Sequence, residues 1–176
     1  MSDVSVRRLG PDDVAAYRAL RQRGLAEHPE AFTSSADEEA ALPADKLARR
    51  LAPDAARPHD AVFGAYVGGE LAGLCGIDVD MRAKVRHKGH VFGMYVPSER
   101  SGRGIGAALI GRVVAHAREH GLSQLALTVT AGNLAARRVY ERAGFAITGR
   151  EPHAIRVDGR AHDKLFMVLF LSPEKR

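Results

Sequence analysis

The sequence predicts an α/β domain with a mixed sheet. Seven β-prone runs alternate with helical segments in the order β-α-α-β-β-β-α-β-α-β-β. Two-residue turns, Gly68-Gly69 and Asp158-Gly159, indicate hairpins on either side of a central part in which strands precede helices. Hairpins give antiparallel neighbours, whereas strand–helix–strand units allow parallel ones, so we expect both pairings in one sheet.

The first elements follow from local signals. Val4 to Arg8 alternates apolar and polar residues, as a short strand does. Gly10-Pro11-Asp12 breaks this strand and begins a helix that continues to about Glu27. Residues 30–60 are rich in proline and contain one expected helix, Ala44 to Leu51. This segment is interpreted either as a lid or acceptor-site wall, or as a plain surface connection.

The remaining elements alternate along the second two-thirds of the chain. Gly121 and Gly144 stand where glycine ends helices, and the apolar run LALTV predicts a central strand. The expected strands are 61–67, 70–79, 88–96, 125–129, 145–148 and 164–171, and the expected helices are 104–120 and 133–143.

The composition limits the class of protein. Apolar residues make up 45% of the 176 residues and charged residues 27%, as in ordinary globular proteins, and we expect a single domain over residues 1–176. No apolar run is long enough to span a membrane, and residues 1–13 lack the apolar core of a secretory signal. The only cysteine, Cys75, lies in an apolar run and is expected to be a buried structural thiol. A reducing, cytoplasmic location fits this cysteine usage.

The net charge of +5 attracts phosphates of any kind, so nucleic acids and nucleotide cofactors are both admissible. The chain has no tryptophan and an aromatic content of only 6%, which leaves few platforms for stacking bases. We therefore expect no nucleic-acid partner. We also expect no membrane partner and no metal.

A glycine-rich turn, SGRGIG from Ser101 to Gly106, stands where the strand ending at Val96 leads into the next helix. Glycines let the backbone approach a ligand closely and adopt positive φ. Unpaired N–H groups in the first helical turn point outward with the positive end of the helix dipole. The turn therefore predicts an anion site suited to a pyrophosphate, with Arg100 and Arg103 beside it. Taken alone, it is also compatible with a tight structural connection.

Two other phosphate-binding motifs fit this turn poorly. A P-loop needs Lys-Ser or Lys-Thr after its last glycine, but Ala107-Ala108 stands there. A dinucleotide fingerprint is followed by an acidic residue after the next strand, whereas here that strand ends in Ala131-Gly132.

A second pattern follows about thirty residues later. Asn133, Ala136 and Tyr140 fall at i, i+3 and i+7, on one face of a helix, and Gly144-Phe145 follows. Together with the glycine turn, this pattern resembles the GNAT superfamily of N-acetyltransferases. Their signature is a strand ending in hydrophobic-x-V, a turn Q/R-x-x-G-x-G/A, another strand, and N-x-x-A-x-x-x-Y-x-x-x-GF. The corresponding stretches are MYV, SGRGIG, LALTV and NLAARRVYERAGF, and the strand order agrees over nearly the whole chain.

One position departs from the signature. The family's Gln/Arg falls on Ser101, with Arg100 one residue early. Because the site relies mostly on backbone N–H groups, we expect Ser101 to affect CoA affinity modestly, with Arg100 or Arg103 supplying the missing charge.

The resemblance implies a mostly antiparallel central sheet with two splayed parallel strands, flanked by helices, and acetyl-CoA as co-substrate. The pantetheine arm would enter between strand 90–96 and strand 125–129, pairing with backbone groups of Met94 and Val96. The N–H near Met94 would polarise the thioester carbonyl. The implied cofactor-binding residues are Met94, Tyr95, Val96, Ser101, Gly102, Arg103, Gly104, Ile105, Gly106, Ala107, Asn133, Ala136 and Tyr140.

Two residues are implied to be catalytic. Tyr140 would protonate the departing CoA thiolate, although its side chain and that of Ala136 are also compatible with simple core packing. His90 occupies about the place where the family often has a glutamate, and histidine titrates near neutrality, so it is one candidate for the general base. A solvated strand end is the alternative for His90. The other candidates for the base are Glu27, Glu30, Asp78 and His162.

The function implied is transfer of an acetyl group to a small amine or amino-acid-like acceptor. By analogy with GNAT domains, Glu30, Phe32, Ser34 and Ser35 are expected on the acceptor side of the cleft. A protein N-terminus or lysine as acceptor and a non-catalytic acyl-CoA-binding module are the alternatives, with a nucleic-acid-binding module last. A homodimer is compatible with the family, whose C-terminal strands frequently pair between subunits.

Overall fold

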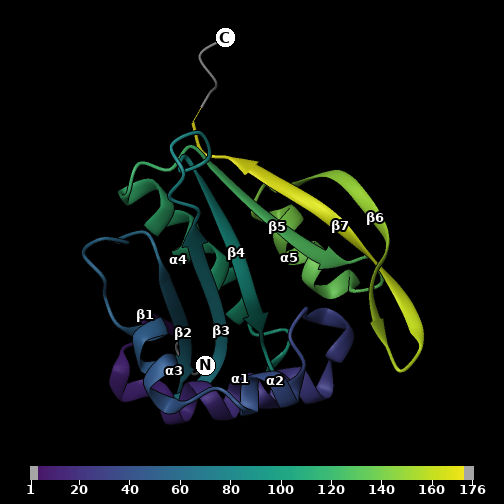
Figure 1. Cartoon of the computed structure of the whole chain (residues 1–176), viewed down its shortest axis with the longest axis horizontal. Helices are drawn as coiled ribbons and strands as arrows, with labels where there is room; N and C mark the ends of the chain where they lie inside the picture. Colours follow the sequence, from purple (N-terminus) through teal and green to yellow (C-terminus); the bar gives the residue numbers. More distant parts are fainter. Residues whose placement is uncertain (1–3, 173–176) are drawn as a thin grey trace.

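The structure, a computed structural model, describes residues 4–172. Its strands form one seven-stranded sheet in the spatial order β1-β2-β3-β4-β5-β7-β6, and only β4 and β5 are parallel neighbours (Figure 1). The strands are β1 Val4–Arg8, β2 Ala61–Val67, β3 Glu70–Val79, β4 Lys88–Tyr95, β5 Gln124–Thr130, β6 Ala146–Val157 and β7 Arg160–Phe170. The helices are α1 Val14–Glu27, α2 Ala36–Ala40, α3 Ala44–Leu51, α4 Ile105–Glu119 and α5 Leu134–Arg142. The predicted mixed α/β sheet with one parallel pair is confirmed.

Helices cover both faces of the sheet. Helices α1 and α3 pack on one face around a core that includes Tyr17, Leu47 and Tyr95. Helices α4 and α5 pack on the other face, over a larger core. Cys75 lies in that larger core, where burial raises the pKa of its thiol to about 12, as expected of a structural cysteine. Within the described part of the chain, no helix has both the length and the apolar character needed to cross a membrane.

Both predicted hairpin turns form. Gly68 and Gly69 adopt φ of 60° and 84°, and Asp158 and Gly159 adopt 47° and 76°. Positive φ at both central residues is the conformation of a type I′ turn, whose twist matches that of paired strands.

Three elements differ from the expected ones. Helix α2 was not expected, although Ser35 and Glu38 form the reciprocal capping box that marks a helix start. Strand β6 continues to Val157 instead of ending at residue 148, and β7 begins at Arg160 instead of residue 164. Most of β6 is exposed, so its sequence lacks the apolar alternation by which strands are recognised.

The parallel pair β4–β5 is short. Lys88, Gly89 and His90 pair with residues 124–126, and the two strands then diverge (Figure 1). Beyond this point β4 remains paired with β3, and β5 remains paired with β7 as far as Thr130. The predicted splay is therefore present, and it starts immediately after His90.

A bulge in β4 accompanies the divergence. Phe92 pairs with Gly76 and Tyr95 pairs with Leu74, so β4 uses one residue more than β3 over this stretch. Gly93, within the bulge, has φ of 64°, a conformation that favours glycine. Because of the extra residue, Phe92 and Tyr95 both face α1, whereas Met94 packs against the core under α4 and α5.

Replacing Gly24 with alanine should destabilise the protein, although alanine is the better helix former. An added Cβ would lie 2.8 Å from Cγ of the buried Tyr95 ring, because α1 approaches β4 closely at this point. Overpacking costs roughly 1–3 kcal/mol, which exceeds the gain of about 1 kcal/mol from replacing a helical glycine. Urea unfolding should therefore give a lower free energy of unfolding.

The matched control is Gly111→Ala within α4, where an added Cβ meets no atom within 4 Å. This variant should be more stable than the native protein by roughly 0.5–1 kcal/mol. Equal stabilisation by both substitutions would contradict the close packing of α1 on Tyr95.

Candidate functional site

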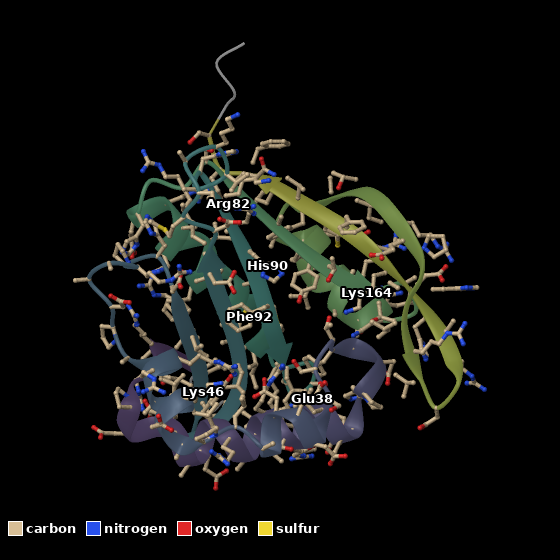
Figure 2. All side chains as sticks on the ribbon, viewed as in Figure 1. Glu38, Lys46, Arg82, His90, Phe92 and Lys164 are labelled. Atoms are coloured by element: carbon tan, nitrogen blue, oxygen red, sulfur yellow. The ribbon has the colours of Figure 1, made fainter. Side chains whose placement is uncertain are left out.

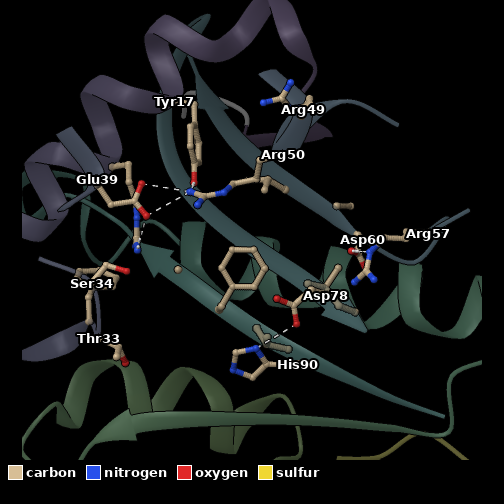
Figure 3. A pocket seen from close by; sticks show the side chains of 18 of the residues that line it. Tyr17, Thr33, Ser34, Glu39, Arg49, Arg50, Arg57, Asp60, Asp78 and His90 are labelled. Atoms are coloured by element: carbon tan, nitrogen blue, oxygen red, sulfur yellow. Dashed lines mark hydrogen bonds and ion pairs between the residues drawn. The ribbon is translucent and has the colours of Figure 1, made fainter. Parts of the chain in front are cut away.

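A cavity of about 530 Å³ lies between the α1–α3 side of the molecule and the sheet (Figure 3). Its wall runs from α1 and α3 across β2, β3 and β4 to Thr128 on β5 and Lys164 on β7. It therefore reaches the place where β4 and β5 part. The lining residues used below are Tyr17, Arg21, Phe32, Ser34, Glu39, Arg50, Asp78, His90, Gly93 and Lys164.

Of the four residues expected on the acceptor side, two line this cavity, whereas Ser35 caps α2. Phe32 and Ser34 belong to the segment between α1 and α2 that closes over it. Glu30 does not line it, and the Glu30 carboxylate lies 3.7 Å from the His28 ring instead. The Glu30 carbonyl accepts a 2.6 Å hydrogen bond from the Thr130 hydroxyl, which fastens this segment to the end of β5.

His90 and Asp78 face one another across β4 and β3 at the cavity wall (Figure 3). Their Nδ1 and Oδ1 atoms are 3.3 Å apart, and both side chains are about half exposed. The His90 ring also stacks on Phe92, with centroids 6.2 Å apart. The sequence left several candidates for the base, and the structure brings these two together in the cavity.

Glu27 and His162, two further candidates for the base, do not line the cavity. Glu27 accepts hydrogen bonds of 2.6 Å from the Tyr95 hydroxyl and 2.6 Å from Arg23. These two bonds lower the pKa of Glu27, because both stabilise its ionised form. A carboxylate held in this way is a poor proton acceptor.

The glycine-rich turn is exposed and precedes α4. Gly102 and Gly104 have φ of 77° and 75°, and a Cβ on either would point into open space. Gly104 caps the helix without any side chain, so the N–H groups of the first turn of α4 are not capped by the protein's own side chains. This arrangement fits the pyrophosphate of CoA.

The side chains around this turn have different surroundings. Ile105 is buried in the core, so only its backbone faces the turn. Ser101 is exposed, as are Arg103 and Ala107. Arg100 donates a 2.6 Å hydrogen bond to Glu70, so its charge is already paired with a carboxylate. Of the two arginines considered as substitutes for the family's Gln/Arg, Arg103 is thus the one left for an anion.

The expected pantetheine-binding stretch of β4 is divided between two faces. Met94 and Val96 are half-buried and pack beside α4 and α5. A Cβ atom added to Gly106 of α4 would lie 3.9 Å from Met94 Sδ. The Tyr95 ring is buried on the opposite face, and its hydroxyl binds Glu27. Only the backbone of Tyr95 is therefore available to a ligand in the gap between β4 and β5.

The helix α5 carries the second half of the motif. Asn133 caps it, because Oδ1 accepts a 3.1 Å hydrogen bond from the Ala136 amide, a structural role that the sequence analysis did not assign. Ala136 is half-buried against the core. Tyr140 is 6% exposed and packs edge-on against Phe145, and burial raises the pKa of Tyr140 far above its usual value. Its hydroxyl is therefore protonated at any physiological pH.

Residues 24–145 match the acetyltransferase (GNAT) family. The chain belongs to this family.

Curated relatives of this GNAT protein act on small molecules. It is 33% identical over 82 residues to the L-methionine sulfoximine/L-methionine sulfone acetyltransferase of Pseudomonas aeruginosa, covering 47% of this chain and 48% of that protein. It is 38% identical over 144 residues to the mycothiol acetyltransferase of Salinispora arenicola, covering 79% of this chain and 43% of that protein. The chain thus spans about half the length or less of the curated relatives it matches.

Solved structures share the fold. A GNAT acetyltransferase of Streptococcus pneumoniae has a TM-score of 0.86 at 24% identity, over 97% of this chain and all of that one. The yncA protein of Salmonella typhimurium, solved with its cofactor acetyl-CoA, has a TM-score of 0.84 at 21% identity, over 99% and 98% of the two chains.

Three buried charged residues that line the cavity of this GNAT protein were not singled out individually from the sequence, namely Arg21, Glu39 and Lys164. Arg21 lies four residues after Tyr17 on α1, so a charge on the buried stripe of that helix was a readable signal. Glu39 belongs to the unexpected α2, and Lys164 is buried beside Leu165 on β7. The local pattern of β7 does not predict the burial of Lys164, because Thr33, which lies against it, comes from a distant part of the chain.

A separate group at the end of α4 brings together His116, Glu119 and His120, whose potential ligand atoms lie within 4.8 Å of one another. His116 Nε2 is already 3.0 Å from the His59 carbonyl, and Glu119 pairs with Arg112. His120 Nδ1 is 2.9 Å from the His116 carbonyl. All three side chains therefore have partners from the protein, and we assign no metal site here.

Replacing Lys164 with methionine should leave the protein at least as stable at pH 7. Lys164 is 6% exposed, and among residues 4–172 its Nζ has only the Thr33 hydroxyl, 3.5 Å away, as a hydrogen-bond partner. Burial lowers the pKa of Lys164, so the folded state binds fewer protons there than the unfolded chain. The contribution of Lys164 to the free energy of unfolding therefore rises with pH, over the range between its lowered pKa and the ordinary lysine pKa of about 10.4. The variant lacks this contribution, so its advantage should shrink between pH 7 and pH 10.

Urea unfolding at both pH values measures this difference, and the exposed Lys46→Met serves as control. A marked loss of stability in Lys164→Met at pH 7 would show that the lysine stabilises the fold instead.

Proposed function

We propose that this GNAT protein is an N-acetyltransferase that moves the acetyl group of acetyl-CoA to the primary amine of a small, amino-acid-like acceptor. Attack would occur directly, in a ternary complex. One observation carries the proposal. The cavity reaches the point where β4 and β5 part, and the glycine-rich turn lies between the end of β4 and the start of α4. An acceptor and a CoA arm thus have separate routes to one point.

Acetyl-CoA supplies the acetyl group as an activated thioester. The uncapped N–H groups at the start of α4 hold the pyrophosphate, with Arg103 beside them. The backbone of β4 after His90 has no partner on β5, so Met94 and Val96 offer N–H and C=O groups to the pantetheine arm. The N–H of Met94 stabilises negative charge on the thioester oxygen.

Two protons are moved in this scheme. His90, oriented by Asp78, takes a proton from the acceptor amine directly or through water. The Tyr140 hydroxyl donates a hydrogen bond, and finally a proton, to the leaving sulfur. Because a thiol with a pKa near 8.5 is more acidic than a phenol near 10, the thiolate also leaves without help, which limits the contribution of Tyr140.

A small acceptor is supported by the shape of the cavity. Phe32, Ser34 and Glu39 line its α1–α2 side, and its volume of about 530 Å³ lies in the range of pockets that bind small molecules. The similarity to an enzyme named for L-methionine sulfoximine and L-methionine sulfone favours an amino-acid-like molecule. A peptide acceptor is the alternative that the same experiment tests.

Incubation with acetyl-CoA and a panel of amines should release CoA, and Tyr140→Phe should lower kcat. We expect a loss of about 10²-fold, at the lower end of the range for general acid catalysis, because burial makes the Tyr140 hydroxyl a weak acid. The panel includes L-methionine sulfone, polyamines and peptides with free N-termini, and CoA release is monitored with a thiol reagent.

Tyr66→Phe is the matched control, because the Tyr66 hydroxyl binds Arg7 and Asp13 away from the cavity. Failure of every amine to release CoA while acetyl-CoA still binds would favour a non-catalytic acyl-CoA-binding module. An unchanged kcat in Tyr140→Phe would return Tyr140 to a packing role.

His90→Ala should alter the pH dependence of kcat/KM. A general base must be unprotonated, so the native activity falls on the acid side of the profile, and removing the base shifts that limb. Asp78→Asn should also alter this limb if Asp78 acts through His90. An acid limb that is the same in native protein and His90→Ala, measured with one acceptor from pH 5 to pH 9, would exclude His90 as the base.

A further inference from the structure

The cavity contains more buried positive charge than its own carboxylates compensate. Arg21 is 9% exposed, and its Nε and Nη1 atoms are buried without any hydrogen-bond partner in the described chain. Its closest carboxylate oxygen, on Glu39, lies 3.7 Å from Nη2, beyond hydrogen-bonding distance. A buried guanidinium with unused N–H donors is costly, so a group that completes its hydrogen bonds is expected to bind there.

Glu39 is already shared with another cation. Arg50 Nη1 lies 3.3 and 3.2 Å from the two Glu39 oxygens and 3.2 Å from the Tyr17 hydroxyl (Figure 3). One carboxylate thus faces two guanidinium groups, and Arg50 makes the hydrogen bonds. Arg21 and Glu39 are buried, whereas Arg50 is exposed. The cluster of these three side chains has a net charge of +1, the sum of Arg21 and Arg50 at +1 each and Glu39 at −1.

Arg21 is also held in place at the cavity wall. Its Cζ lies 4.7 Å from the centre of the Phe32 ring, a cation–π contact that fixes the plane of the guanidinium. A methyl group on Gly93 would lie 3.5 Å from Arg21 Nη1, so the guanidinium lies against the bulge of β4. Figure 2 shows His90 and Phe92 on β4, and Glu38 of α2 on the helical side of the molecule.

We propose that Arg21 binds the carboxylate of the acceptor, which makes an α-amino acid the substrate class of this site. The inference rests on the proposed acetyltransferase function and specifies its acceptor. A carboxylate matches the planar fork of a guanidinium and neutralises the excess charge of the cluster.

The position of Arg21 also explains why the amine of such an acceptor would be reactive. In an α-amino acid a single carbon atom separates the amine from the carboxylate. Arg21 lies beside Gly93, and the next residue, Met94, carries the N–H proposed to polarise the thioester. A carboxylate bound at Arg21 therefore positions the α-amine next to the reacting carbonyl, where orientation contributes strongly to rate.

The test uses L-methionine, L-phenylalanine and L-glutamine, each compared with its carboxamide and with the amine that lacks the carboxylate. For the native protein, kcat/KM should favour the amino acid by roughly 10–100-fold, mostly through KM, as expected for a charge-assisted hydrogen bond. Arg21→Met should remove this preference, and Arg21→Lys should retain part of it. Comparing each ratio between native protein and variant cancels the different basicities of the amines.

Arg23→Met on the same helix is the control, because Arg23 pairs with Glu27 and Glu99 outside the cavity. It should keep the preference for the amino acid. Arg21→Met should melt at least as late as the native protein, since it removes a guanidinium with two unpaired nitrogens and Glu39 retains Arg50 as partner. If Arg21 only stabilised the fold, the variant would melt earlier and lose activity equally with all three forms of each acceptor.

Calorimetric titration of the protein with these amino acids, in the presence of CoA, tests the carboxylate site at Arg21 separately from the acetyltransferase activity. Amino-acid binding that Arg21→Met weakens supports the carboxylate site. Absence of amino-acid binding, or binding of equal strength in native protein and Arg21→Met, overturns it. If amines that lack a carboxylate cause CoA release and none of the amino acids does, the acetyltransferase proposal stands and only this inference is rejected.

Discussion

The site depends on one structural constraint, the separation of β4 from β5 after His90. The extra residue at Gly93 keeps β4 paired with β3 while it turns away from its parallel neighbour, and β5 stays with β7. Backbone N–H and C=O groups in the middle of a sheet normally find partners in the next strand. Here those on the β5 side of β4 have no partner on β5 after His90, and under the proposed function an extended molecule with amide groups would satisfy them as a strand would. The same bulge places Phe92 and Tyr95 on the α1 face, so one residue affects both the gap between β4 and β5 and the cavity.

The other side of the site is made by a segment with its own anchors. Thr130 binds the Glu30 carbonyl, Ser35 caps α2, and Glu39 binds Arg50 of α3. These contacts hold the segment over the sheet without any strand pairing. Under the proposed function, the sheet and α4 would form the cofactor side, whereas the segment between α1 and α3 would form the acceptor side. Substitutions in that segment would then change the acceptor without disturbing the gap between β4 and β5.

This division also explains how much the sequence could predict. Runs such as LALTV, turns such as Gly68-Gly69 and the glycine turn before α4 are local signals, and the elements they predicted are present. The boundaries of β6 were wrong because an exposed strand carries no apolar alternation. The partners of Arg21, Glu39 and Lys164 come from distant parts of the chain, so their burial is a result of tertiary packing. A buried arginine looks, in sequence, like any solvated one unless its place on the apolar stripe of its helix is noticed.

The energetics of Arg21 connect stability with specificity. Removing a guanidinium from water and leaving two of its nitrogens unpaired costs on the order of 1–3 kcal/mol in the free protein. The contact with Phe32 offsets part of this cost, and the hydrogen bonds of Glu39 to Arg50 contribute nothing to Arg21 itself. A bound carboxylate would recover the rest, and a neutral amine would not. The preference for an amino acid over an amine without a carboxylate would thus arise from the Arg21 guanidinium, which is buried and oriented before the acceptor binds. Little further ordering would therefore oppose binding.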